Sequence, residues 1–337
     1  MPLKRADIHT HILPREIPDF KARFGYGGFV RLVHSRGGKA EMARDDGRPF
    51  RSVGPELWDP AARLRACDRS GVSLQVLSTV PVMFSYWAKP KDALHVCRVL
   101  NDHIAGVVAA RPDRFAGLGA LPMQAPDLAA RELERCVEQL GLRGAQIGTN
   151  VNGRNLSERA FEPVFAAAET LGAALFIHPW DMMGQERMEK YWLPWLVGMP
   201  AELSRALCSM IFGGVFERHP RLRAAFAHGG GSFGPTLGRI RHGFKARPDL
   251  CAVDNPRDPA RYLGRFWVDS LVHDKQALRA ALALFGESRV ALGSDYPFPL
   301  GEDQPGALVA SLRLDPRLRD RVFWDNAMAW LGRRGRQ

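Results

Sequence analysis

Two histidines, His9 and His11, lie one residue apart near the N-terminus, in the segment Asp-Ile-His-Thr-His of residues 7–11. Successive side chains of a β-strand point to opposite faces, so a strand over this segment would direct both imidazoles to the same side. Two neutral imidazoles placed in this way can bind one metal ion, and imidazole suits zinc, copper, iron and nickel. A His-x-His pair is short enough to occur on an ordinary protein surface, so its meaning depends on the rest of the chain.

Three further side chains that could bind a metal or take part in a reaction lie at the ends of apolar segments later in the chain. They are His178 at the end of residues 173–178, His228 at the end of residues 222–228, and Asp295 at the end of residues 290–295. The C-terminal ends of parallel strands meet at one mouth of a barrel, so these side chains would converge with the N-terminal pair. We interpret the set as a metal site. The other histidines fall in predicted helices or loops and are interpreted as structural: His34, His95, His103, His219, His242 and His273.

The elements that must position these side chains alternate along the chain. Short apolar segments predict strands that begin with the N-terminal segment and continue over residues 72–78, 115–121, 144–147, 173–178, 222–228, 266–269 and 290–295. Amphipathic segments predict helices over residues 60–70, 91–110, 127–140, 157–171, 201–216, 235–245 and 275–285, with two more that end near residue 331. Asp59, Asp127 and Ser157 are expected as N-caps.

Strands that are almost continuously apolar indicate a sheet buried on both faces, which is therefore parallel. Eight such units predict a (β/α)₈ TIM barrel. An open doubly wound sheet is less favoured, because no Gly-x-Gly-x-x-Gly turn follows the first strand. We expect a single domain over residues 1–337, with an insertion subdomain at about residues 14–58 that contains a short hairpin near residues 39–50. A second long insertion, rich in Met and Trp, is expected over residues 180–200.

Composition narrows the class of protein. The chain has 337 residues, 46% of them hydrophobic, and a formal net charge of +11, which argues for a folded chain with a sizeable core. The N-terminus lacks the apolar segment of a signal peptide, no apolar run is long enough to span a bilayer, and five scattered cysteines without CxxC spacing are typical of a cytoplasmic protein. Basic residues cluster only at Arg333, Arg334 and Arg336, so binding to nucleic acid is not favoured. A basic site would attract an acidic small molecule.

Four motifs together resemble the amidohydrolase superfamily: Asp-Ile-His-Thr-His, Phe-Ile-His-Pro at residues 176–179, Ala-His-Gly-Gly-Gly at residues 227–231 and Gly-Ser-Asp-Tyr-Pro at residues 293–297. Residues 192–200, WLPWLVGMP, and residues 296–302, YPFPLGE, more narrowly resemble the metal-dependent decarboxylases of that superfamily. The resemblance covers nearly the whole chain and implies the amidohydrolase type of TIM barrel.

The resemblance implies one metal ion per subunit, usually zinc with other divalent transition metals as alternatives, bound by His9, His11, His178 and Asp295. The fourth strand offers Gln146 and not the bridging Lys or Glu of dinuclear relatives, which favours a single ion. Such a metal lowers the pKa of its water toward about 7. His228 would be the general base or acid beside that water, and Asp295 is counted with it as catalytic. The resemblance leaves open whether hydroxide adds to the substrate or only relays a proton.

The implied reaction is non-oxidative loss of CO₂ from an unsaturated dicarboxylate of tryptophan/kynurenine or nitrobenzoate-type catabolism, whose own conjugation accepts the electrons. Two carboxylates require cationic partners, and a guanidinium binds a carboxylate through two parallel hydrogen bonds. The family pattern points to Arg51 in the first insertion and to Arg239, which would reach a neighbouring subunit's site in a homodimer. Met182, Trp195 and Phe298 are expected to form the apolar wall.

A hydrolase or hydratase on the same barrel, acting on a lactone or an unsaturated diacid, is the main alternative, because the four barrel motifs serve both reactions. A binding protein for nucleic acid is the third alternative. It is disfavoured because the chain contains no RNP, helix-turn-helix or zinc-finger pattern.

Overall fold

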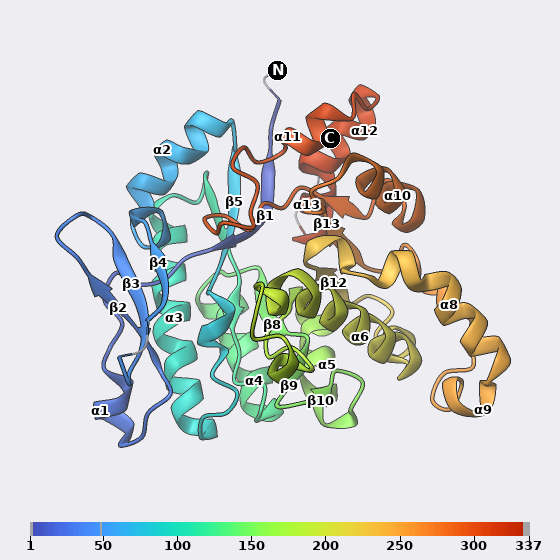
Figure 1. Cartoon of the computed structure of the whole chain (residues 1–337), viewed down its shortest axis with the longest axis horizontal. Coiled ribbons are helices and arrows are strands. Elements are labelled where there is room, and N and C mark those ends of the chain that lie inside the picture. The colour runs from blue at the N-terminus through green and yellow to red at the C-terminus, as the bar shows by residue number, and fades with distance from the viewer. Residues whose placement is uncertain (1–2, 48, 333–337) are drawn as a thin grey trace.

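Eight parallel strands form the barrel that the alternating pattern predicts (Figure 1). The computed structural model describes residues 3–47 and 49–332, so the basic tail at Arg333, Arg334 and Arg336 lies outside the described residues. In chain order the barrel strands are β1 (Ala6–His11), β5 (Leu74–Ser78), β6 (Phe115–Gly117) with β7 (Gly119–Ala120), β8 (Gly144–Gly148), β11 (Ala174–His178), β12 (Arg223–Phe226), β13 (Trp267–Asp269) and β14 (Val290–Ala291). These strands pair in parallel in the orders β1-β5-β6 and β7-β8-β11-β12-β13-β14.

The barrel closes between its first strand and the segment after its last. The backbone N–H of Ile8 donates to the carbonyl of Leu292 at 2.9 Å, and that of His11 donates to the carbonyl of Tyr296 at 2.8 Å. On the opposite side, β6 and β7 are two parts of one strand interrupted at Leu118, so that β6 pairs with β5 and β7 with β8. This closure brings the first and last strands of the barrel together. His9 and Asp295 can meet only because of it.

Helices surround the barrel, and their starts follow from local signals. Asp59 accepts from the N–H of Ala61, Pro60 occupies the first position of α2, and Gly71 ends that helix with φ 70°; all three match the prediction. The helices are α2 (Pro60–Ser70), α3 (Pro90–Ala110), α4 (Pro126–Glu134), α5 (Glu162–Leu171), α6 (Met199–Phe212), α7 (Val215–Arg218), α8 (Phe233–Ala246), α9 (Pro248–Cys251), α10 (Lys275–Phe285), α11 (Ala307–Ser311), α12 (Pro316–Asp320) and α13 (Asn326–Trp330).

Two expected N-caps are wrong. Helix α4 starts at Pro126 after Ala125, which places Asp127 inside the first turn. Helix α5 starts at Glu162, after a 3₁₀ turn over Arg159–Phe161, and so Ser157 caps nothing. Both helices have a proline in their first turn, and its fixed φ, which suits that turn, sets where each helix starts.

Three other expected boundaries are also wrong. The helix predicted over residues 201–216 is broken at Gly214, which has φ 67° and separates α6 from α7. The sixth strand ends at Phe226 and the eighth at Ala291, before the residues expected to close them. His228 and Asp295 follow in left-handed turns with φ 49° and 56°, and a residue in that conformation cannot continue a strand.

The first insertion contains α1 (Phe20–Phe24) and an antiparallel sheet of β2 (Val30–His34), β3 (Ala40–Arg44) and β4 (Pro49–Val53). The expected hairpin near residues 39–50 is therefore part of a three-stranded sheet, and His34 lies in a strand, contrary to the prediction of a helix or loop. Figure 1 shows this sheet beside the barrel, on the side of α3. Its buried residues share a core with the start of α3, and Phe298 packs against that core. The division into a subdomain at residues 14–58 stays a prediction.

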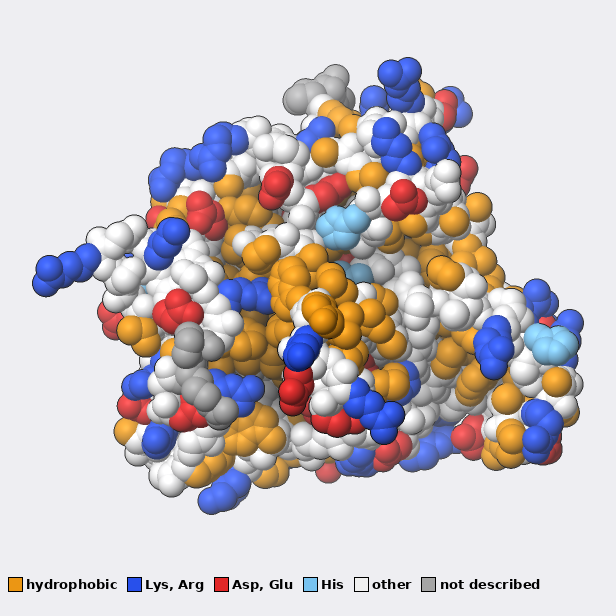
Figure 2. All heavy atoms as spheres, viewed as in Figure 1, with side chains coloured by type: hydrophobic (Ala, Val, Ile, Leu, Met, Phe, Trp, Pro, Cys, Tyr) orange, Lys and Arg blue, Asp and Glu red, His pale blue; other side chains and the backbone are white. Residues whose placement is uncertain are grey.

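The second insertion, residues 179–198, ends in a π-helical turn over Pro194–Gly198 that leads directly into α6. A short hairpin of β9 (Asn150–Val151) and β10 (Arg154–Asn155) follows the fourth strand. Figure 2 shows hydrophobic side chains gathered near the middle of the face that Figure 1 presents. The exposed large hydrophobic residues of this insertion are Met183, Tyr191, Trp192, Leu196 and Val197. Within the described ranges, every helix is too short or too polar to cross a membrane.

Candidate metal centre and active site

Four buried side chains meet at the C-terminal mouth of the barrel. His9 and His11 come from β1, His178 from the end of β11, and Asp295 from the turn after β14. One nitrogen or oxygen atom of each residue lies within 4.8 Å of the others. Nε2 of His9 lies 3.4 Å from Oδ1 of Asp295, and Nε2 of His11 lies 3.0 Å from the same oxygen. The structure therefore brings together the four ligands that the family resemblance implies.

The atoms that face one another in this cluster lack partners. Nε2 of all three histidines and Oδ1 of Asp295 are buried, and none has a hydrogen-bond partner among the described residues. A buried polar group without a partner costs about 1–3 kcal/mol, so four at one point are unfavourable unless a ligand satisfies them. Three imidazole nitrogens and one carboxylate oxygen form a donor set that suits a divalent transition metal. The residues present fit one such ion.

The opposite nitrogen of each imidazole is held by an oxygen acceptor. Nδ1 of His9 lies 2.7 Å from Oδ2 of Asp269, that of His11 lies 2.9 Å from the carbonyl of Thr79, and that of His178 lies 2.9 Å from the carbonyl of Pro179. These acceptors place the proton on Nδ1 and leave the lone pair of Nε2 for the metal. The sequence interpretation assigned no role to Asp269, although it closes the predicted strand at residues 266–269 much as Asp295 closes the segment at residues 290–295.

Burial and charge favour the protonation states that a metal requires. Burial lowers the pKa of His178 well below its ordinary value, and the imidazoles of His11 and His9 lower it further. Burial also lowers the pKa of His11. Burial acts to raise the pKa of Asp295, but the neighbouring imidazoles, His9 first and then His11 and His228, hold it well below its usual range. The surroundings thus favour neutral imidazoles at His11 and His178 and an ionised carboxylate at Asp295, as metal ligation demands.

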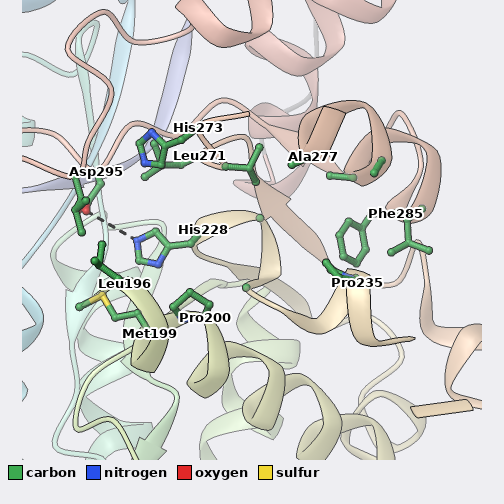
Figure 3. A pocket seen from close by; sticks show the side chains of 18 of the residues that line it. Leu196, Met199, Pro200, His228, Pro235, Leu271, His273, Ala277, Phe285 and Asp295 are labelled. Carbon is green, nitrogen blue, oxygen red and sulfur yellow. Dashed lines mark ion pairs between the residues drawn. The ribbon is translucent and has the colours of Figure 1, made fainter. Parts of the chain in front are cut away.

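His228 lies beside the four ligands without belonging to them. Its Nε2 is 3.9 Å from Oδ2 of Asp295, and Figure 3 shows the two side chains pointing toward each other. The His228 ring centroid lies 5.2 Å from that of His9 and 5.4 Å from that of His178. Burial opposes the charged form of His228, but the Asp295 and Asp269 carboxylates raise its pKa above the ordinary value. This position suits a proton donor or acceptor next to the metal.

Arg51, on β4, faces the cluster from the first insertion. It lines a small cavity together with His11, His178 and Asp295. Its guanidinium carbon lies 4.7 Å from the ring centroid of Phe298. In the part of the chain that the structure describes, no carboxylate lies within ion-pair distance of the Arg51 guanidinium. Burial lowers the pKa of Arg51, yet a guanidinium stays charged in proteins, so an unpaired cation faces the cavity.

Aromatic rings form the walls of this cavity. Trp195 and Phe298 line it as expected, and the sequence interpretation missed Phe50, Trp180 and Trp192, which also line it. The sequence does not predict that these three side chains face the cavity, because they lie in irregular or edge segments where no regular period sets the side-chain direction. Met182 lines a neighbouring cavity together with Trp180 and Trp195, and its place in the apolar wall of the substrate site stays a prediction.

A second, larger cavity of about 880 Å³ opens on the other side of the cluster (Figure 3). His228 and Asp295 lie at one end, and the rest is mostly apolar, formed by α6, α8, α10 and the loop after β13. His273, interpreted from the sequence as a structural loop residue, is exposed and also lines this cavity. Arg239 lies on the exposed side of α8 and lines neither cavity. Its contribution to a partner's site stays a prediction.

A closed barrel with three histidines and an aspartate at its C-terminal mouth is the architecture of the metal-dependent amidohydrolases. Residues 6–333 match the model of the amidohydrolase family, and the chain belongs to that family. It is 56% identical to the 2-amino-3-carboxymuconate-6-semialdehyde decarboxylase of Dictyostelium discoideum over 97% of this chain and 91% of that protein. The enzyme of the same name from Caenorhabditis elegans is 38% identical over 97% of this chain and 94% of that protein.

Solved structures agree with this assignment. The 5-carboxyvanillate decarboxylase of Sphingomonas paucimobilis has a TM-score of 0.84 and 26% identity, covering 98% of this chain and 100% of that one. A 5-carboxyvanillate decarboxylase mutant from Novosphingobium aromaticivorans, solved with manganese, has a TM-score of 0.76 and 25% identity, covering 82% of each chain. The segments at residues 192–200 and 296–302 resemble the 2-amino-3-carboxymuconate-6-semialdehyde decarboxylases in particular, and the comparisons confirm this narrower resemblance.

Proposed function

We propose that this protein is a metal-dependent carboxy-lyase that converts 2-amino-3-carboxymuconate-6-semialdehyde to 2-aminomuconate-6-semialdehyde without oxidation. The observation that carries the proposal is the group of four buried donor atoms without partners, next to the unpaired cation of Arg51. The metal would hold the reacting end of an anionic substrate, and the cation would hold a carboxylate. The two curated relatives that match nearly the whole chain bear the name of this reaction.

Zinc is the proposed cofactor, with one ion per subunit bound by His9, His11, His178 and Asp295. Three imidazoles with one oxygen ligand suit zinc, and a carboxylate also suits manganese, the metal in the solved relative from Novosphingobium. When bound, the ion supplies Lewis acidity and lowers the pKa of a coordinated water. The side chains around it supply orientation and proton transfer.

Decarboxylation breaks a carbon–carbon bond and leaves an electron pair that the conjugated semialdehyde accepts. The carbon that loses CO₂ then takes up one proton, so the reaction needs a proton donor and no oxidant. We assign that donor to His228, whose raised pKa favours the protonated ring. The guanidinium of Arg51 holds one substrate carboxylate through two hydrogen bonds, and the rings of Trp195 and Phe298 enclose the conjugated chain.

The second substrate carboxylate requires another cation, and we assign it to Arg239 of a second subunit in a homodimer. Support comes from its place on α8, which Figure 1 shows projecting away from the barrel mouth of its own subunit. Among the described residues, Arg239 has no hydrogen-bond or ion-pair partner. The proposed setting is tryptophan/kynurenine or nitrobenzoate-type catabolism in the cytoplasm, and the five free cysteines suit a reducing compartment.

The test uses purified protein and the semialdehyde substrate. Decay of its near-ultraviolet absorbance together with release of one CO₂ per substrate is the expected result. Removal of metal by a chelator should abolish both signals, and zinc should restore them. Turnover of a lactone or an unsaturated diacid without CO₂ would instead support a hydrolase or hydratase.

A further inference from the structure

Asp269 is a buried carboxylate at the end of β13 that touches both the metal cluster and the turn that carries His228. Its Oδ2 lies 2.7 Å from Nδ1 of His9 and accepts from the backbone N–H of His228 at 2.9 Å. Its Oδ1 accepts from the backbone N–H groups of Gly229 and Leu271 at 2.8 and 3.1 Å. One side chain thus connects a metal ligand with the backbone of the proposed proton donor.

The carboxylate has no Lys or Arg within ion-pair distance in the described part of the chain. A fully buried charge is unfavourable unless hydrogen bonds and an opposite charge compensate for it. Four hydrogen bonds satisfy both oxygens of Asp269, and a metal cation on the far side of the His9 ring would supply the opposite charge. Acceptors behind metal-bound imidazoles raise the basicity of the ring and fix its orientation.

The turn at His228 needs support of this kind. His228 has φ 49°, in the left-handed region that a non-glycine residue rarely adopts. Gly229 follows with φ 62°, and a Cβ at that position would lie 2.3 Å from Cγ1 of Val272. A residue in a sparsely populated backbone conformation costs about 1–3 kcal/mol and persists when its surroundings hold it there. The two hydrogen bonds from residues 228 and 229 to Asp269 hold this turn.

We propose that Asp269 is a positioning residue that couples the metal centre to His228. It keeps the proton of His9 on Nδ1, so that Nε2 is free for the metal, and it fixes the left-handed turn that aims the His228 ring at Asp295. The inference rests on the proposed metal-dependent function, but its effect on metal binding does not depend on which substrate is used.

The substitution Asp269→Asn tests the inference, because an amide has only one acceptor oxygen. All four partners of Asp269 are donors, so in either orientation the NH₂ group faces two donors. Either the His9 ring loses its hydrogen-bond acceptor or the backbone N–H of Gly229 loses its acceptor. In either orientation the negative charge behind the His9 ring is lost and the ring becomes less basic, so we expect the zinc dissociation constant, measured by competition with a chromophoric chelator, to rise about 10–100-fold. Turnover per bound zinc should also fall at saturating metal.

A matched control separates positioning from general destabilisation. Glu132 is another buried carboxylate, on α4 outside the barrel, which accepts from Nδ2 of Asn101 at 2.8 Å and pairs with Arg135 at 2.9 Å. Glu132→Gln should lower thermal stability but leave zinc affinity and turnover per zinc unchanged. If Asp269→Asn loses stability alone, as the control does, the proposal is overturned.

A third variant addresses the turn by itself. Gly229→Ala strains the left-handed backbone but leaves the Asp269–His9 hydrogen bond intact, so turnover should fall while zinc affinity stays close to that of the wild type. In a His228→Ala background, Asp269→Asn should weaken zinc binding as before but lower turnover no further. Additive losses of turnover in the double variant would show that Asp269 does not act through His228.

A measurement on the wild-type protein covers the case in which Asp269→Asn fails to fold. With ¹⁵N-labelled histidine, the metal-free protein should show the Nδ1–H tautomer for His9, assigned by loss of its signal in His9→Gln. An Nε2–H tautomer would overturn the proposal. If the wild type binds zinc but does not decarboxylate the semialdehyde, the proposed reaction fails, and the zinc and tautomer measurements still decide the role of Asp269.

Discussion

Nε2 of His11 lies 3.0 Å from Oδ1 of Asp295, although the two residues come from the first strand of the barrel and from the turn after the last. The contact exists because the N–H of His11 donates to the carbonyl of Tyr296, which closes the barrel one residue from Asp295. Metal ligation and barrel closure therefore depend on the same few residues. Variants at this seam should affect metal content and stability together.

His9→Ala, His11→Ala and Asp295→Ala should each lose metal and activity together, since each removes one of four ligands. Elemental analysis of the purified variants measures the metal, and the absorbance assay measures the activity. Full metal occupancy in all three variants would show that the ligand assignment is wrong.

His228→Ala should retain its metal, because the imidazole lies beside the four ligands and 3.9 Å from the nearer Asp295 oxygen. Turnover should fall about 10²–10⁴-fold, the usual contribution of general acid–base catalysis. Metal analysis and steady-state rates of the same preparation provide the check. A rate near that of the wild type would remove His228 from the mechanism.

Arg51→Lys should raise KM and lower kcat/KM even though it preserves the charge, because an ammonium cannot form the two parallel hydrogen bonds of a guanidinium. A loss of about 10–100-fold corresponds to one charge-assisted hydrogen bond of roughly 1.5–3 kcal/mol. Arg31→Lys, at a partly buried position on β2 whose guanidinium lies 3.7 Å from an Asp19 oxygen, is the matched control and should behave like the wild type. Equal kinetics for the two variants would contradict substrate binding by Arg51.

Mixtures of inactive Arg239→Ala and inactive His228→Ala subunits should recover activity if Arg239 acts in the partner's site. A hybrid dimer then contains one site with both wild-type residues. Random exchange makes about half of the dimers hybrid, so activity should approach roughly one quarter of the wild-type value. No recovery after confirmed subunit exchange would place Arg239 in its own subunit's site or outside catalysis.

Stability at acid pH should depend on Glu162, which lies 2.6 Å from Nε2 of His219 and 3.0 Å from Nε of Arg218. Burial acts to raise the Glu162 pKa, but hydrogen bonds from His219 and Arg218 lower it below the ordinary value of 4.5. A carboxyl whose pKa is lower in the folded state stabilises the protein above about pH 4.5 and loses this contribution as the pH falls through the folded-state pKa.

The free energy of unfolding of the wild type should therefore fall more steeply below pH 5 than that of Glu162→Gln. Solvent screening limits the difference to on the order of 1 kcal/mol. Urea unfolding at pH 7 and pH 4 measures it, and the other acid-labile groups cancel between the two proteins. Parallel pH profiles would show that the Glu162 charge does not stabilise the fold.

Local patterns in the chain determined the fold class and the ligand types. The spacing of His9 and His11 places both imidazoles on one face of any strand, whatever surrounds it. The alternation of apolar segments with amphipathic ones requires a parallel sheet covered by helices, and residues after strand ends share the mouth of a barrel. These inferences need only the periodicity of strands and helices, which neighbouring residues set.

Only the tertiary structure decided how the side chains around the metal meet. The turn at His228, the hydrogen bonds of Asp269, the unpaired state of Arg51 and the position of Met182 in a separate cavity all depend on contacts between segments far apart in the chain. The direction of a side chain in a turn or an irregular insertion follows from its packing partners, and no local period describes it. Sequence pattern therefore placed the candidate ligands and His228 at one barrel mouth, and the family resemblance implied which four of them bind the metal. Three-dimensional packing determined which residues hold them in place.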